Sequence, residues 1–183
     1  MIRYVLIFII GVTALYFFLQ GRLNNHEETL PVFLQQDKLA TAHQTKISVQ
    51  VHSLFKPDSI QLETLKKDYS NLWAHLNHLY ATNDVNAGKE YYTEGWFKQI
   101  TRHYTGAHPQ PLQRTDENHE LHIQNWSGDA LVCSLIDSNV VFTYRLPDGT
   151  LQNSRANLAM VLLFQGDHWR IDALRVLQET EMR

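Results

Sequence analysis

The sequence predicts an α+β fold with an N-terminal transmembrane helix, followed by a long helix and short helices packed on a curved antiparallel sheet. Three observations lead to this fold class. An uncharged apolar run fills residues 4–19, apolar residues recur at three- and four-residue steps through 57–84, and apolar alternation broken by turns fills 121–177. Helices that precede a run of strands are typical of α+β domains. We therefore divide the chain into three parts: a transmembrane anchor at 1–23, a linker at 24–45 and a single α+β domain at 46–183.

The composition fits a globular domain and excludes one class of partner. Hydrophobic residues make up 44% and charged residues 19% of the 183 residues, which is enough apolar material for a core. The formal net charge of −3 provides no strongly basic surface, so we expect no nucleic-acid partner. Cys133 is the single cysteine, which excludes an internal disulfide and a cysteine-based metal site. We expect it to be a small buried apolar residue.

The apolar run at 4–19 predicts a membrane anchor. As a helix it extends about 24 Å, slightly short of the hydrocarbon core, and Ile2 and Leu23 lengthen it because Arg3 and Arg22 can snorkel outward. A cleaved signal peptide is the alternative, but no small-residue cleavage site follows the run. The positive-inside rule favours a cytoplasmic N-terminus. We thus predict a single-pass membrane protein whose C-terminal domain is exported to the periplasm or the extracellular side.

The first half of the domain predicts an edge strand and three helices. Residues 46–55 alternate through Ile47 and Val49, which is a strand pattern. Asp58 and Gln61 form a capping-box pattern that begins the long helix. The stretches 85–92 and 96–104 predict two shorter helices.

The second half predicts antiparallel strands after a loop at 105–120. The apolar stretch 130–146 is too long for one straight strand, so we expect a bulge near 137–139. Pro147-Asp148-Gly149-Thr150 is a hairpin turn signal, and a second hairpin turns at 165–168. We expect this last hairpin to lie inside the sheet, with Trp169 filling the space between sheet and helix.

Three segments resemble the nuclear transport factor two-like superfamily, whose fold is also called cystatin-like or cone-shaped. They are the helix junction "YATNDVNAGKEYY", the strand pair around "PDGT" and the final "GDHWRI" hairpin, within residues 59–177. The resemblance implies a cone between helix and sheet. The superfamily includes isomerases, dehydratases, ligand-binding proteins and interaction modules. Some members carry one membrane anchor, such as the periplasmic assembly subunits of type IV secretion systems, so the fold alone leaves function open.

Histidine pairs are the candidates for a metal site. His75 and His78 lie one helical turn apart, but they fall outside the apolar stripe and have no third ligand, so we expect a solvated helix face. His119 and His122 are an odd number apart on a strand and therefore face opposite sides. We predict no metal and no cofactor.

An enzyme of this fold needs a buried acid or base in the cone. The sheet offers Asp137, Tyr144 and Asp172, and the aromatic residues Tyr91 and Tyr92 are further candidates for the cone wall. None matches a catalytic motif, so we assign no catalytic residue. The residues that we predict to line the cone are Tyr80, Trp96, Asp137 and Tyr144.

The lack of a catalytic signature, together with the anchor, leads us to expect a membrane-anchored protein-interaction or assembly module that binds a protein partner. A small-ligand pocket, including an isomerase- or dehydratase-like one, is the alternative, and self-association through the sheet is the third. A cavity of about 300 Å³ or more with a buried Asp or His inside favours the pocket. A closed cone argues against it; four residues could fill such a cone: Trp73, Trp96, Phe142 and Trp169.

Overall fold

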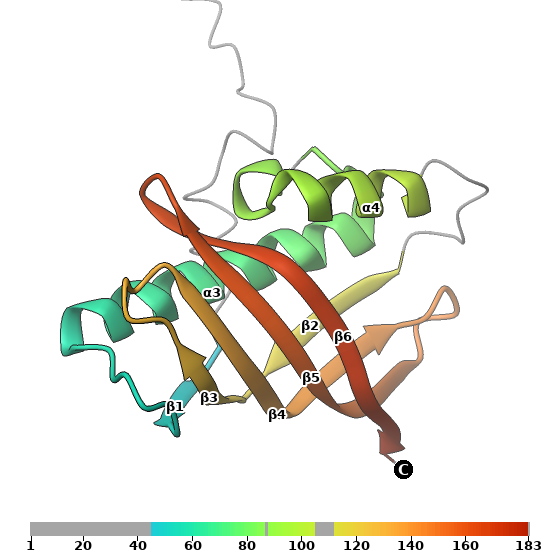
Figure 1. Ribbon diagram of the computed structural model, residues 1–183. Helices are drawn as coiled ribbons and strands as arrows, with labels where there is room; N and C mark the ends of the chain where they lie inside the picture. Colours follow the sequence, from blue (N-terminus) through green and yellow to red (C-terminus); the bar gives the residue numbers. More distant parts are fainter. Residues whose placement is uncertain (1–44, 87, 105–111, 183) are drawn as a thin grey trace, which may run out of the picture. The chain divides into compact units, whose positions relative to one another are not determined.

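The computed structural model describes residues 45–86, 88–104 and 112–182 (Figure 1). Its helical elements are α3 (Ser59–Thr82), the 3-10 helix η2 (Lys89–Tyr91) and α4 (Glu94–Tyr104). Its strands are β1 (Ile47–Val51), β2 (Gln113–Glu117), β3 (His119–Trp126), β4 (Val132–Arg145), β5 (Leu151–Gln165) and β6 (His168–Met182). The described residues thus form a mixed α+β fold, as the order of sequence patterns predicted.

The predicted anchor at 1–23 and all but the last residue of the predicted linker at 24–45 lie outside the described residues. Both therefore stay predictions. Within the described ranges, no helix is both long enough and apolar enough to cross a bilayer.

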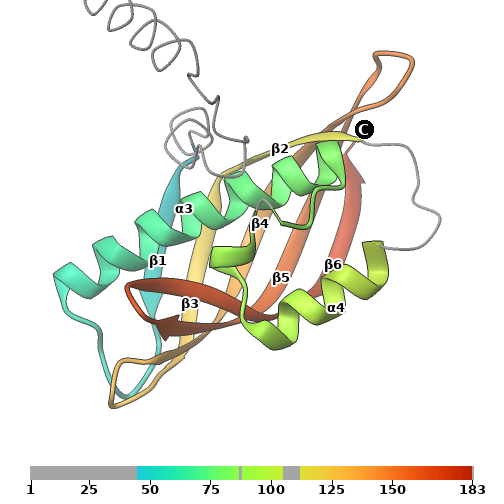
Figure 2. The same cartoon turned by 90° about the horizontal axis from the view of Figure 1, so that it is seen from above.

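The six strands form one curved sheet, in which five follow the order β1-β3-β4-β5-β6 and the sixth, β2, pairs with β4. β4 is long enough to pair with β3 along its first half and with β2 along its second half. β1 runs parallel to β3, so the sheet is mixed and not purely antiparallel as we expected. The helices α3 and α4 cover the same face of this sheet (Figure 2).

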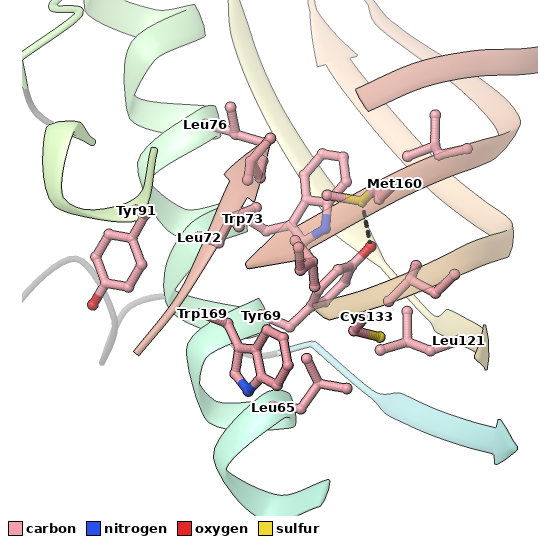
Figure 3. Packing of buried hydrophobic residues seen from close by; sticks show 14 of the residues in the cluster. Leu65, Tyr69, Leu72, Trp73, Leu76, Tyr91, Leu121, Cys133, Met160 and Trp169 are labelled. Carbon is pink, nitrogen blue, oxygen red and sulfur yellow. Dashed lines mark hydrogen bonds between the residues drawn. The ribbon is translucent and has the colours of Figure 1, made fainter. Parts of the chain in front are cut away.

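Helix α3 begins where the capping-box pattern predicted. The Asp58 carboxylate accepts the Gln61 N–H at 2.8 Å, and the Gln61 side chain accepts the Asp58 N–H at 2.9 Å. The helix ends at Asn83, whose positive φ of 59° is typical of a helix C-cap. Its apolar stripe packs on the sheet through residues such as Leu65, Tyr69 and Leu72 (Figure 3).

Two polar α3 residues are buried, and we had expected one of them, His75, on the solvated helix face. His75 stacks on the Tyr91 ring of η2 at a centroid distance of 4.8 Å. Asp68 accepts the Trp169 N–H at 2.9 Å. His75 and Asp68 are buried for the same reason: η2 and the β5–β6 hairpin cover this flank of the helix, so its buried face is wider than the apolar stripe.

The bend in β4 occurs at the expected position. The pairing of β4 with β5 shifts between Asp137 and Val140, and Asn139 adopts a positive φ of 59°. The Asn157 side chain accepts the Asn139 N–H at 3.0 Å, which holds the bulge. Asp137, at the start of the bulge, points into the core, where it is fully buried.

Three other sequence expectations are wrong. The stretch 85–92 contains a three-residue 3-10 turn in place of a helix, and the expected loop at 105–120 contains β2. The last hairpin lies at the edge of the sheet, because β5 is the one described strand that pairs with β6, and a single bridge joins Tyr92 to Ile171 on the other side. Trp169 still fills the space that we predicted, where it packs on Trp126 at 5.0 Å and on Phe164 at 5.4 Å. Cys133 is buried in the core, as expected.

Candidate functional site

A cavity of about 500 Å³ lies between α3, α4 and the concave face of the sheet. The helices contribute one part of its wall: Trp73, Leu76, Leu79, Tyr80, Trp96, Gln99 and Ile100. The strands contribute the rest: Arg114, Phe142, Tyr144, Ala156, Leu158, Leu174, Val176 and Glu179. The wall is thus mainly aromatic and aliphatic, with charged groups from β2 and β6.

The structure places three of the four predicted cone-lining residues in this wall. Tyr80, Trp96 and Tyr144 face the cavity, whereas Asp137 lies fully buried behind it. The other acid that we considered, Asp172, accepts the Thr93 hydroxyl at 2.8 Å outside the wall. The two further aromatic candidates, Tyr91 and Tyr92, are buried in the core and do not line the cavity.

Arg114 is the wall residue that the sequence analysis missed. Its guanidinium carbon lies 4.0 Å from the centre of the Tyr80 ring, 4.9 Å from that of Phe142 and 5.4 Å from that of Trp73. Its Nε–H donates to the Asn77 side-chain oxygen at 2.9 Å. Among the described residues, no carboxylate forms an ion pair with Arg114. The cavity wall therefore contains a cation that is enclosed by rings and has no ion-pair partner in the part of the chain that the structure describes.

The other charged wall residue, Glu179, is hydrogen-bonded within the sheet. Its carboxylate accepts the Ser154 hydroxyl at 2.6 Å and the Tyr144 hydroxyl at 3.3 Å. Burial raises the pKa of Tyr144, the Arg114 charge lowers it and the Glu179 charge raises it. Tyr144 therefore stays protonated at neutral pH and can offer its hydroxyl to the cavity or to Glu179.

A chain of hydrogen bonds leads from Arg114 into the core. Asn77 donates to one oxygen of Asp116, and the His119 Nε2 lies 2.9 Å from the other. On the far side, the His119 Nδ1 and the Tyr69 hydroxyl both lie 2.5 Å from Oδ2 of Asp137. The side chains of His119 and both of its aspartate partners are completely buried.

His119 carries a positive charge at neutral pH. An ionised carboxylate can only accept hydrogen bonds, so both ring nitrogens must donate when each faces a carboxylate. Burial by itself lowers the pKa of His119, but the hydrogen bonds to Asp116 and Asp137 outweigh it and raise the pKa from 6.5 to about 9. The network is therefore an imidazolium held between two carboxylates.

The network supports the cavity but does not open into it. The Trp73 ring packs on His119 at 5.2 Å and on Phe142 at 5.4 Å between ring centroids. Trp73 and Phe142 belong to the wall of the cavity. These rings separate the imidazolium from the cavity. Of the network residues, Arg114 is the one that reaches the wall, so a bound molecule meets the network there.

The histidine pairs do not come together with further ligands in the described part of the chain. His119 points inward, while His122 lies on the opposite face and approaches His52 with 3.3 Å between ring nitrogens, as the odd spacing predicted. No group of three or more His, Cys, Asp or Glu residues suited to a metal ion occurs among the described residues.

Comparisons with known proteins find similarity in structure but not in sequence. No protein-family model matches the sequence, and no curated protein matches it. Several solved structures are similar in fold, and one of them is a nuclear transport factor 2-like superfamily protein. A hexachlorocyclohexane dehydrochlorinase, LinA type 2, has a TM-score of 0.49 and 8% identity, with 69% of this chain and 94% of that chain covered.

Two further neighbours also have low sequence identity to this chain. A nuclear transport factor 2-like superfamily protein from Salmonella enterica serovar Typhimurium has a TM-score of 0.45 and 16% identity, with 63% of this chain and 91% of that chain covered. A putative scytalone dehydratase from Novosphingobium aromaticivorans has a TM-score of 0.47 and 7% identity, with 68% and 89% covered. At these identities no functional residue is transferred to this chain.

Proposed function

We propose that this protein binds a small, largely apolar molecule in the cavity between α3, α4 and the sheet. The observation that carries the proposal is the cavity itself, whose volume of about 500 Å³ is within the range of about 300–1,000 Å³ typical of small-molecule sites. A cone filled by its own side chains would argue against this function. Trp73, Trp96 and Phe142 instead stand in the wall around the open volume, and Trp169 packs elsewhere.

The position of the titratable groups supports binding over catalysis. The buried acid and base groups, Asp116, His119 and Asp137, lie behind the aromatic wall. Glu179 is the one carboxylate among the described wall residues, and it already accepts two hydrogen bonds. An isomerase or dehydratase needs an acid or base within hydrogen-bonding reach of its substrate. We therefore propose a binding protein.

The single-pass anchor at 4–19, the exported domain and a protein partner or self-association stay predictions. The support for the anchor is the apolar sequence run. If the anchor is present, the ligand site is held close to a membrane face, which suits a ligand that is itself apolar.

The test is calorimetric titration of the full chain with 2-naphthamide, a neutral aromatic probe. We expect saturable binding. The variant Ala156→Phe fills the cavity from its buried wall position and should weaken binding at least about tenfold, which corresponds to about 1.4 kcal/mol. The matched control is Ala159→Phe, three residues further along β5 and outside the wall, which should bind as the wild type does. Absence of binding by the wild type, or equal loss in both variants, would refute the proposal.

A further inference from the structure

We propose that the ligand carries a carboxylate or a similar acidic group and that Arg114 recognises it. This inference rests on the proposed function and narrows its ligand class to small apolar acids. It also assigns Asn77 as the positioning residue that sets the direction of the guanidinium.

The first argument is the unmatched charge of Arg114. The side chain is half-buried among the rings of Tyr80, Phe142 and Trp73, and its Nε–H is taken by Asn77. No hydrogen bond joins its terminal nitrogens to any residue in the described part of the chain. Ring faces attract a cation but do not use its N–H groups. The guanidinium therefore keeps donors in the geometry that matches a carboxylate.

The second argument is that Arg114 is held in place from the core side. A guanidinium can only donate and an ionised carboxylate can only accept, so the Asn77 oxygen must face Arg114 and its NH₂ must face Asp116. The amide therefore has one orientation, fixed at both ends. Asp116 is itself fixed by the buried His119. The Nε side of the guanidinium is thus directed to the core, which leaves its terminal nitrogens for the cavity.

Glu179 is the other charge in the wall, and it forms no ion pair with Arg114. The Glu179 carboxylate accepts hydroxyl groups of Ser154 and Tyr144. Glu179 is therefore held by hydroxyl groups and does not use the N–H groups of Arg114, which stay available to an anion.

The experiment compares 2-naphthoate with 2-naphthamide, which have nearly the same shape and differ in charge. Calorimetry on the full chain should show that the wild type prefers the naphthoate by about tenfold or more. Arg114→Gln should abolish this preference, because it weakens the binding of naphthoate much more than that of naphthamide. Arg114→Lys, which keeps the charge without the planar fork, should retain a reduced preference.

Two further variants separate positioning from general charge effects. Asn77→Leu should reduce the naphthoate preference and leave naphthamide binding unchanged, because it frees the guanidinium without removing it. Glu63→Gln, on the exposed face of α3 and outside the cavity wall, is the matched charge control and should leave the preference unchanged.

The outcomes distinguish the two proposals. Equal binding of both probes by the wild type, or an unchanged preference in Arg114→Gln, would overturn the assignment of an acidic ligand and leave the cavity as a binding site. Failure of the wild type to bind either probe would overturn both proposals. An unchanged preference in Asn77→Leu would overturn the positioning role alone.

Discussion

Raising the pH from 6.5 to 9 should lower the free energy of unfolding of this protein. In this range the folded state keeps a proton on His119 that the unfolded chain releases. Burial lowers the pKa of His119, but the hydrogen bonds to Asp116 and Asp137 raise it from 6.5 to about 9 in the folded state. In the unfolded chain the pKa of a histidine is about 6.5. Between these values the folded state holds one proton more than the unfolded state, so the free energy of unfolding falls as the pH rises.

The size of this effect follows from the shift. The contribution of the protonated His119 is fully present below pH 6.5 and is lost as the pH rises through about 9. One extra proton corresponds to a slope of about 1.4 kcal/mol per pH unit, and the whole window to roughly 3 kcal/mol. Burial raises the pKa of the Cys133 thiol to about 12, so this cysteine does not ionise in the window.

The assay is urea unfolding of the full chain at several pH values from 6 to about 9.5, followed by tryptophan fluorescence. His119→Gln should remove the slope, and Asp116→Asn should move the loss of stability to lower pH because one carboxylate partner is gone. His122→Gln is the matched control, since His122 lies on the outer face of the sheet against His52. A wild-type stability that stays constant or rises across the window would refute the reasoning, as would an equal loss of slope in the control.

Two further variants test single contacts by the same urea assay. Tyr69→Phe removes the hydroxyl group that donates to Asp137 at 2.5 Å. It should lower the free energy of unfolding by about 2 kcal/mol, because a buried carboxylate loses a donor. An unchanged urea midpoint would show that this hydrogen bond contributes nothing to stability. Asp58→Ala removes the N-cap of α3 and should lower the free energy of unfolding by about 1 kcal/mol. Thr64→Ala, on the exposed face of the same helix, is the comparison. Equal effects of both changes would contradict a specific capping role.

The sequence patterns that predicted the fold correctly are those in which one local rule acts alone. The capping box at Asp58 and the apolar repeat of α3 depend only on helix geometry. The bulge at 137–139 followed from strand length, and the hairpin at Gly149 from turn chemistry, which its φ of 85° now confirms. Errors arose where a distant segment changes the surroundings, as at His75, which η2 covers.

Strand β2 shows why the most informative part of the site was missed. A strand is recognised by apolar residues at alternate positions, but the inward positions of β2 are Arg114 and Asp116. Arg114 donates to Asn77 of α3, which lies far away in the sequence, and Asp116 faces His119, which begins β3 three residues later. The sequence signal for this site is the spacing of Arg114, Asp116 and His119. Arg114 and Asp116 are two residues apart, so they lie on one face of the strand. The chain then turns at Asn118, where φ is 55°, and this turn directs His119 to the same side.

The same network links the stability of the core to the recognition of a ligand. A buried ion network contributes little net stability compared with apolar residues of the same volume, because desolvation of the charges offsets their attraction. Stability alone therefore does not account for an imidazolium between two carboxylates in the centre of this core. Its hydrogen bonds converge on Asp116 and continue through Asn77 to Arg114 at the cavity wall. Apolar packing cannot orient the Arg114 guanidinium toward the cavity, whereas these hydrogen bonds can. The polar residues of the network therefore have a role in the proposed binding of an acidic ligand.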